Sequence, residues 1–132
     1  MGRRVLIVDD VIDITEMLND LVTMLGHQAR VATHGERGLA IAREFRPDLV
    51  LLDLAMPYPD GYEVARRLRA EPWGRSVELI AMSGLDHRHA REKAIEVGFD
   101  RHFVKPLTLS LLRSVLTRAI LRFGSVVSFT VQ

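Results

Sequence analysis

Apolar residues occur along this chain in two alternating patterns. Continuous apolar runs stand at residues 5–8 and 49–52, and a third run, interrupted by one glutamate, stands at 77–82. The stretches between them carry apolar residues three and four positions apart, which is the spacing of a helix with one buried face. Short continuous runs rich in β-branched residues are typical of strands that are buried on both faces of a parallel sheet.

Extended to the weaker segments, this pattern predicts five strands that alternate with five helices. The strands are expected at residues 5–8, 29–32, 49–52, 77–82 and 102–104, and the helices at 14–25, 35–45, around 64–68, 87–97 and 109–120. Such alternation favours an α/β sandwich with right-handed crossovers. The strands with the strongest apolar runs should be central, and the first helix should bury Met17 in its apolar stripe.

Polar residues at the expected helix ends suggest how the helices begin and stop. Asp13, with Glu16 three residues later as in a capping box, is expected to cap the first helix, and Asp60 and Asp86 are expected to cap two later helices. Glycine commonly ends a helix just after its last apolar residue, and the chain has Gly26 and Gly98 at such positions.

Length and composition fit one globular domain. The 132 residues are 48% hydrophobic and 27% charged and include no cysteine, so the chain can bury a core but has no disulfide, thiol nucleophile or thiolate metal site. The net charge of +1 gives no reason to expect direct nucleic-acid binding. The apolar runs are too short for a membrane span or a secretory signal, so the cytoplasm is the expected compartment.

Two segments carry separate expectations. The basic cluster of Arg66, Arg67 and Arg69 is interpreted as a solvated helix face. The domain is expected to cover residues 1–123, because the β-prone residues 124–132 do not fit the repeat. This tail could be an extra strand, a segment for self-association in a homodimer, or a remnant of cloning.

Polar residues follow the predicted strands at equivalent positions: Asp9 and Asp10, Asp53, Ser83 and Lys105. The carboxyl ends of parallel strands lie at one edge of an open sheet, where ligand sites form. Three clustered carboxylates repel one another, and Mg²⁺, which prefers oxygen ligands, relieves that repulsion. A carboxylate can also attack phosphorus, while a lysine and a hydroxyl stabilise the phosphoryl oxygens. The residues therefore indicate phosphoryl transfer to an aspartate with the help of a metal ion.

The order and spacing of these motifs resemble those of the response-regulator receiver domains of two-component signalling, the CheY-like superfamily, over residues 3–122. The matching segments are VLIVDD at 5–10, LLDL at 51–54, MP at 56–57, DG at 60–61, Ser83 and KP at 105–106. The resemblance implies a flavodoxin-like (βα)5 sandwich with a parallel sheet in the order 2-1-3-4-5. It also implies either a stand-alone receiver or one that belongs to a longer protein, such as a hybrid histidine kinase.

The resemblance implies a role for each acidic residue. Asp53 would be the phosphoacceptor. Mg²⁺, or Mn²⁺ in its place, would be bound directly by Asp10, Asp53 and the backbone carbonyl of Ala55, and through a water molecule by Asp9.

The resemblance also implies the remaining chemistry. Lys105 and Ser83 would contact the phosphoryl group, and the peptide bond between Lys105 and Pro106 would be cis. The donor would be a phosphohistidine on a histidine kinase or a histidine phosphotransfer protein. Apart from this self-phosphorylation and its autodephosphorylation, the protein would not be an enzyme.

Phosphorylation would shift an existing equilibrium between two states of one surface. This surface is the face formed by helix 87–97, strand 102–104 and the last helix, and an unknown output partner would bind it. Ser83 and His102 would be the switch residues of that face. His102 stands where the family usually has Tyr or Phe, so it is interpreted either as the switch ring or as a partly exposed strand residue. Ala55 offers no side chain that could hold a water near the phosphoryl group.

Two other functions are considered. A phosphatase of the haloacid-dehalogenase type also uses a strand-end aspartate, but it needs a second aspartate two residues later, where this chain has Ala55. A constitutive interaction module would keep the receiver fold without phosphorylation. The complete set of site residues argues against this module, while the departures at Ala55 and His102 keep it open.

Overall fold

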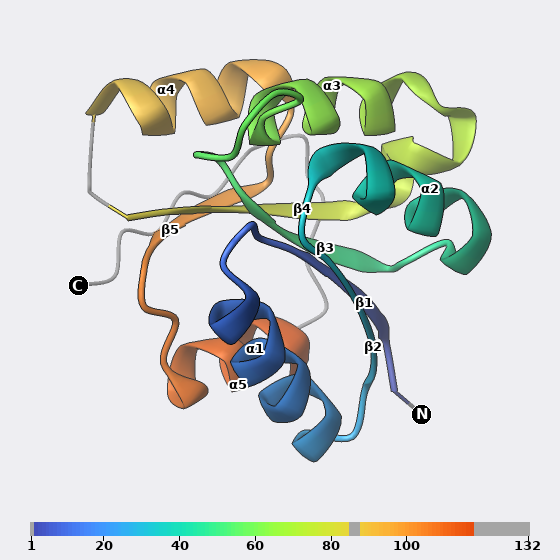
Figure 1. The fold of residues 1–132 in the computed structure, drawn as a ribbon, viewed down its shortest axis with the longest axis vertical. Coiled ribbons are helices and arrows are strands. Elements are labelled where there is room, and N and C mark those ends of the chain that lie inside the picture. The colour runs from blue at the N-terminus through green and yellow to red at the C-terminus, as the bar shows by residue number, and fades with distance from the viewer. Residues whose placement is uncertain (1, 85–87, 118–132) are drawn as a thin grey trace.

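The computed structural model describes residues 2–84 and 88–117 of the chain. They form one sheet, drawn in Figure 1, from β1 (Arg4–Val8), β2 (Gln28–Ala32), β3 (Leu49–Asp53), β4 (Glu78–Ser83) and β5 (Arg101–Val104). The strand order is β2-β1-β3-β4-β5, and all neighbouring strands are parallel. The predicted doubly wound fold and its strand order are therefore confirmed, with β1, β3 and β4 in the interior of the sheet.

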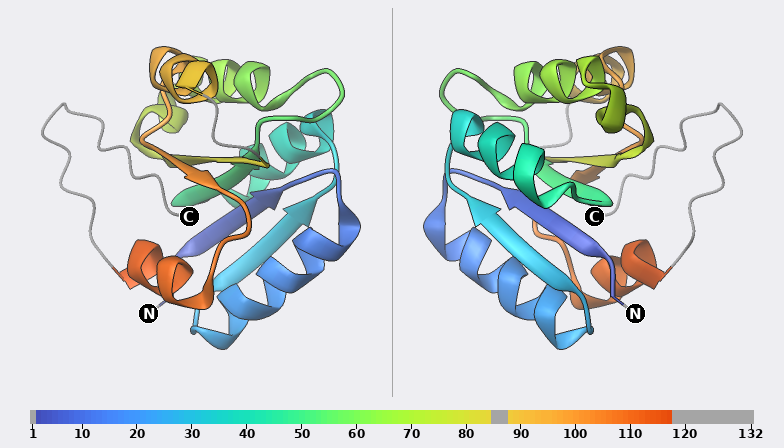
Figure 2. Two further views of the ribbon diagram at one scale, coloured as in Figure 1. Left: turned by 90° about the vertical axis from the view of Figure 1, so that its left-hand side faces the viewer. Right: turned by 90° about the vertical axis from the view of Figure 1, so that its right-hand side faces the viewer.

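Helices cover both faces of the sheet, as Figures 1 and 2 show. One face is covered by α1 (Ile12–Met24) and α5 (Leu109–Thr117), and the other by α2 (Gly35–Phe45), α3 (Gly61–Ala70) and α4 (Arg88–Val97). A 3₁₀ helix, η1 (Pro72–Ser76), which the apolar pattern did not predict, joins α3 to β4. The end of the last predicted helix, residues 118–120, lies outside the described residues. Within the described part of the chain, no helix is both long enough and apolar enough to pass through a bilayer.

The continuous apolar runs are explained by two cores, one on each face of the sheet. Alternate residues of β1 point to opposite faces, so Leu6 and Val8 pack under α2, α3 and α4, whereas Val5 and Ile7 pack under α1 and α5. Each of these four side chains is almost fully buried. Because both faces are covered, the strand has no polar face, and this is why its sequence does not alternate.

The start of α1 differs from the prediction. The helix begins at Ile12 with Val11 as its N-cap and without a side-chain cap, so the prediction that Asp13 caps it is wrong. The Asp9 carboxylate instead accepts a hydrogen bond from the Val11 N–H at 2.9 Å. Asp9, one of the predicted strand-end carboxylates, therefore holds the backbone where α1 begins. Asp13 lies in the first turn of the helix.

Other helix ends agree with the sequence. The Asp60 carboxylate accepts a hydrogen bond from the Glu63 N–H at 2.9 Å and caps α3. Gly26 and Gly98 have φ values of +94° and +105°, the left-handed conformation that ends many helices at glycine. The predicted cap Asp86 lies outside the described residues.

Two predictions about side-chain burial are wrong, that Met17 is buried and that Arg69 is solvated. Met17 is 43% exposed, and Thr15 is buried in its place, because α1 presents a slightly rotated face to the sheet. Arg69 is not part of a solvated face: its guanidinium donates to the carbonyls of Gly98 and Val77 and pairs with Asp100 at 2.9 Å. It joins α3 to the loops that flank β4 and β5.

One glutamate lies inside the protein at the edge of the sheet that is remote from the strand-end aspartates. Glu78, the first residue of β4, is 2% exposed, and Arg3 donates to its carboxylate at 2.8 Å. Burial raises the pKa of Glu78 although Arg3 pulls it down. Arg3 also donates to the carbonyl of Val115 in α5. The pair therefore ties the chain start and β4 to α5.

Candidate metal and phosphoacceptor site

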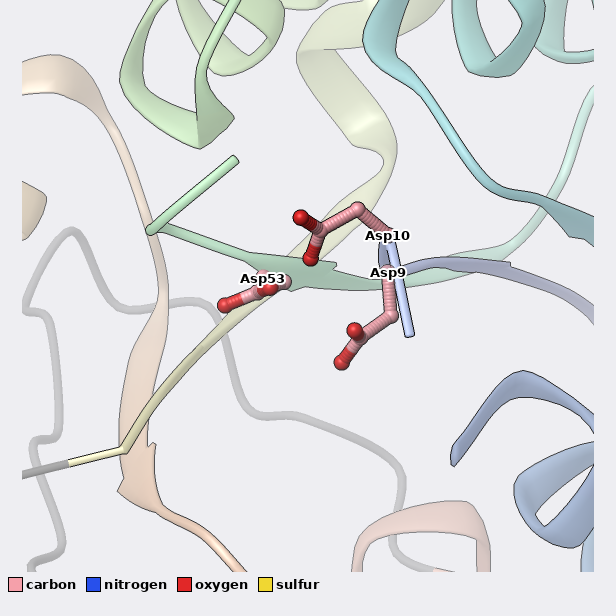
Figure 3. Close-up of side chains that lie close together, drawn as sticks. All are labelled: Asp9, Asp10 and Asp53. Carbon is pink, nitrogen blue, oxygen red and sulfur yellow. The ribbon is translucent and has the colours of Figure 1, made fainter. Parts of the chain in front are cut away.

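The three predicted acidic residues meet at the carboxyl edge of the sheet. Asp9 and Asp10 follow β1, and Asp53 is the last residue of the neighbouring strand β3. One carboxylate oxygen of each residue lies within 4.8 Å of the others. Figure 3 shows the three side chains turned toward a common space. The sequence separation of more than forty residues between Asp10 and Asp53 is closed by the parallel pairing of β1 with β3.

Burial differs strongly among these carboxylates. Asp9 is fully buried and Asp53 is 3% exposed, whereas Asp10 lies at the surface. The Ala55 N–H donates to Oδ1 of Asp53 at 3.2 Å. The acidic pocket thus has a buried floor, formed by Asp9 and Asp53, and an open rim at Asp10.

Lys105 closes the site on the side of β5. Its Nζ lies 2.7 Å from Oδ2 of Asp9 and 3.4 Å from Oδ1 of Asp53. The Lys105 N–H donates to the carbonyl of Ser83 at 2.7 Å, which anchors the lysine beyond the end of β4. The peptide bond that follows, Lys105–Pro106, is cis.

The charges at the site shift two pKa values. Burial and the neighbouring charge of Asp9 raise the pKa of Asp53 to about 6, against the opposing pull of Lys105 and the Ala55 N–H. Burial by itself lowers the pKa of Lys105, but its hydrogen bond to Asp9 and the charges of both aspartates outweigh burial, so this pKa is raised. One ammonium therefore does not balance two buried carboxylates.

This donor set fits a magnesium ion. Mg²⁺ takes oxygen ligands, is commonly held by one or two carboxylates, and keeps several waters. The cluster offers two buried carboxylates and one solvent-facing carboxylate, and the excess negative charge on Asp9 and Asp53 is what a divalent cation would neutralise. Ala55, whose N–H contacts Asp53, is exposed at the surface.

The two predicted switch residues are in contact. Ser83 is the last residue of β4 and His102 lies on β5, and both are buried. Oγ of Ser83 lies 2.8 Å from Nε2 of His102. The interpretation of His102 as a partly exposed strand residue is therefore wrong, since the side chain is 1% exposed.

The loop after Asp53 is held close to the end of β3. A Cβ atom on Gly61 would overlap the carbonyl of Asp53 and approach Cα of Leu54 within 2.7 Å, so only glycine fits at the start of α3.

The Tyr58–Pro59 peptide bond in this loop is cis, a feature that the sequence did not indicate. Tyr58 lies against Arg67, whose guanidinium also pairs with Glu36 and Glu63.

Two exposed apolar side chains beside the open rim at Asp10 were not predicted from the sequence. Val11 and Ile12 directly follow Asp10, and they are 45% and 59% exposed. Their position outside the apolar stripe of α1 is the sequence feature from which their exposure could have been predicted. The two residues thus place exposed β-branched side chains directly beside Asp10.

The fold and the site together define a class of protein: doubly wound α/β domains that accept a phosphoryl group on a strand-end aspartate beside a magnesium site. The chain belongs to one family of this class, the response regulator receiver domain, whose model matches residues 5–117. Asp9, Asp10 and Asp53 form the acidic pocket of this receiver. It is a phosphoacceptor of two-component signalling, not a conventional enzyme, and its acidic pocket fits Mg²⁺.

Curated relatives support this assignment. Sporulation initiation phosphotransferase F of Bacillus subtilis is 31% identical over 118 residues, which are 89% of this chain and 94% of that protein. Probable transcriptional regulator ycf27 of Porphyra purpurea is 38% identical over 121 residues, which are 89% of this chain and 49% of that protein. The chain thus spans about half the length of the ycf27 proteins that it matches.

Solved structures show the same fold. Chemotaxis protein CheY4 of Vibrio cholerae superposes with a TM-score of 0.85 at 25% identity, covering 91% of this chain and all of that chain. The receiver domain of sensor histidine kinase PA1611 from Pseudomonas aeruginosa superposes with a TM-score of 0.80 at 27% identity, covering 88% and 95%. That structure has a magnesium ion coordinated in its active site cleft.

Proposed function

We propose that Asp53 is the residue that takes the phosphoryl group. The observation that carries this proposal is the convergence of Lys105 and the other two aspartates on its buried carboxylate. In the transfer, an oxygen of Asp53 forms a bond to phosphorus while the bond from phosphorus to the donor nitrogen breaks. The donor imidazole leaves and takes its proton from solvent. Lys105, 3.4 Å from Asp53, then lies beside the new phosphoryl oxygens and stabilises their charge.

The closeness of the three carboxylates also supports a proposed set of metal ligands. Asp10, Asp53 and the Ala55 carbonyl would bind Mg²⁺ or Mn²⁺ directly, and Asp9 would act through a water molecule, because its Oδ2 already pairs with Lys105 at 2.7 Å. When bound, the ion would offset negative charge on the transferred group. Ser83 would donate its hydroxyl hydrogen to a phosphoryl oxygen, since it lies one residue beyond Met82, the β4 partner of Asp53.

A phosphohistidine on a histidine kinase or a phosphotransfer protein would be the donor. The exposed Val11 and Ile12 beside Asp10 support this partner, because an apolar contact there would deliver a histidine to the open rim. Substituting both with serine should weaken phosphoryl transfer from a protein donor, whereas transfer from acetyl phosphate should stay unchanged.

The output surface is proposed to be the α4–β5–α5 face. Ser83 touches His102 of β5, so a change at the phosphoryl group reaches this face through one contact. The output partner, and any homodimer, would read the change there. We also propose the cytoplasm as the compartment, since the cysteine-free sequence needs no oxidising surroundings. The expected domain boundary at residue 123 and the tail 124–132 lie outside the described residues.

The test is phosphorylation of the purified chain by acetyl phosphate with Mg²⁺, followed by intact mass. The wild type should gain one phosphoryl mass, and Asp53→Ala should gain none. Asp20→Ala, which removes an exposed carboxylate of α1, is the matched control and should be labelled like the wild type. Equal labelling of Asp53→Ala would refute the acceptor assignment, and an unlabelled wild type would favour the constitutive interaction module.

A further inference from the structure

The imidazole of His102 is enclosed by protein and lies against the hydroxyl of Ser83. The side chain is 1% exposed, that of Ser83 is 6% exposed, and Nε2 lies 2.8 Å from Oγ. A phenylalanine ring at this position would fill the space but would offer no hydrogen-bonding atom. In this chain, the coupling between the two residues is therefore a direct hydrogen bond and not only a packing contact.

Two backbone hydrogen bonds fix β4 at Ser83 relative to Lys105 and to the strand that ends at Asp53. The carbonyl of Ser83 accepts the N–H of Lys105 at 2.7 Å, and the preceding carbonyl, that of Met82, accepts the N–H of Leu54 at 2.9 Å. Leu54 follows Asp53, and Met82 is the β4 partner of Asp53. The backbone of Ser83 is thus held in place, and the direction of its hydroxyl hydrogen is set by what its oxygen contacts.

The hydrogen on His102 decides whether that hydroxyl is available. A serine hydroxyl has one hydrogen to donate and two lone pairs to accept with. If Nε2 of His102 carries no hydrogen, it takes the hydroxyl hydrogen, and Ser83 has none left for a phosphoryl oxygen. If Nε2 carries a hydrogen, it donates to Oγ, and the hydroxyl hydrogen points elsewhere and is polarised by the incoming bond.

We propose that His102 is a positioning residue for phosphoryl transfer, whose Nε2–H donates to Oγ of Ser83 and directs the Ser83 hydroxyl hydrogen at the phosphoryl group on Asp53. This inference rests on the proposed function of Asp53. No proton moves along the chain of hydrogen bonds: Nε2 and Oγ keep their hydrogens. With acetyl phosphate, the oxygen–phosphorus bond forms at Asp53 as the phosphorus–oxygen bond of the donor breaks and acetate leaves.

The phosphoryl group and the histidine tautomer are coupled by this arrangement. The anionic phosphoryl oxygen is a strong acceptor for the hydroxyl hydrogen. It therefore favours the Nε2–H form of His102 and disfavours the reverse direction of the bond. The state of Asp53 is transmitted to β5 by the direction of a single hydrogen bond, without any need for the ring to leave the core.

Variants of the pair test the positioning role. His102→Phe keeps an aromatic ring but removes both nitrogens, and His102→Gln can place an amide N–H near the position of Nε2. At saturating acetyl phosphate and Mg²⁺, His102→Phe should lower the first-order rate constant of phosphorylation roughly tenfold, as expected for loss of a hydrogen bond that serves a charged group. His102→Gln should recover most of the rate. A wild-type rate in His102→Phe would overturn the proposal.

A double-mutant cycle separates positioning from a general effect on folding. Ser83→Ala should slow phosphorylation by itself, and Ser83→Ala with His102→Phe should be no slower than Ser83→Ala, because His102 acts only through the hydroxyl. Rate losses that multiply in the double variant would overturn the proposal.

Nitrogen-15 NMR of the wild type gives a readout that needs no variant. With Mg²⁺ and beryllofluoride as the phosphoryl mimic, the ring shifts of His102 should show a hydrogen on Nε2, and an Nε2 without hydrogen would overturn the inference. If the wild type takes no phosphoryl group from acetyl phosphate, the proposed function fails and this inference with it. If Asp53 is labelled but the cycle or the tautomer disagrees, only the role of His102 fails.

Discussion

Lys105 makes its shorter ion pair with Asp9, not with Asp53. Its Nζ lies 2.7 Å from Oδ2 of Asp9 and 3.4 Å from Oδ1 of Asp53. The ammonium therefore balances mainly the fully buried Asp9, and the charge of Asp53 is only partly compensated. Burial, together with the charge of Asp9, therefore outweighs the pull of the lysine, and the pKa of Asp53 is raised to about 6.

The first prediction concerns the dependence of stability on pH. The pKa of Asp53 in the folded chain, about 6, lies above its ordinary value of 3.8, so folding favours the protonated carboxyl. The stability from this preference is fully present below pH 3.8 and is lost as the pH rises through about 6. Asp53→Asn mimics the neutral form, so at pH 7.5 it should exceed the wild type in free energy of unfolding by about 1–2 kcal/mol.

Urea unfolding in EDTA at several pH values measures this difference. The two proteins should converge as the pH falls toward 4, because the wild-type carboxyl then also carries a proton. Asp20→Asn is the control for removal of an exposed carboxylate. A gap between Asp53→Asn and the wild type that does not change with pH would contradict the raised pKa.

The second prediction concerns the removal of Lys105. Lys105→Met keeps the length of the side chain but leaves two buried carboxylates without a cation. At pH 7.5 in EDTA, it should lower the free energy of unfolding by about 2–4 kcal/mol. Combining it with Asp9→Asn should restore much of that loss, because only one of the two unpaired charges then remains and the repulsion between them is gone. Additive losses in the double variant, measured by urea unfolding, would argue against a direct Lys105–Asp9 coupling.

The third prediction concerns magnesium and Asp10. At a Mg²⁺ concentration tenfold above its dissociation constant, the metal should stabilise the wild type by about 1.4 kcal/mol. Asp10→Asn should lose this increment, while its stability in EDTA should stay within about 0.5 kcal/mol of the wild type because the carboxylate is exposed. Thermal unfolding with and without Mg²⁺ is the measurement. Metal stabilisation that survives in Asp10→Asn would remove Asp10 from the ligand set.

The fourth prediction separates two arginines of α3. Arg69 bonds to backbone carbonyls and to Asp100, so Arg69→Leu should cost about 2–4 kcal/mol of stability by leaving a half-buried charge and acceptors without partners. Arg66, which is half exposed and pairs only weakly with Glu63 at 3.4 Å, is the matched control, and Arg66→Leu should change stability by less than about 0.5 kcal/mol. Equal effects of the two substitutions would contradict the bridging role of Arg69.

The apolar pattern was sufficient for the architecture. Runs such as 49–52 have no polar face, and only a strand covered on both sides tolerates that composition. The alternation of strands and helices then restricted the topology, because right-handed crossovers leave few arrangements. The first residue of a helix was harder to predict from the sequence. Asp13 has a side chain that suits a cap, but the Asp9 carboxylate accepts the Val11 N–H, and α1 begins one residue before Asp13.

The sequence alone determined which residues form the acidic pocket. Asp9, Asp10 and Asp53 end adjacent parallel strands, and the carboxyl ends of such strands share one edge whatever the details of packing. The tertiary structure alone decided how the charges are divided and which neutral groups meet. That Lys105 prefers Asp9, and that His102 is buried against Ser83, depends on distances of a few ångström between side chains on different elements. Such distances depend on how the whole domain packs. The position of a residue at the end of a strand gives no information about that packing.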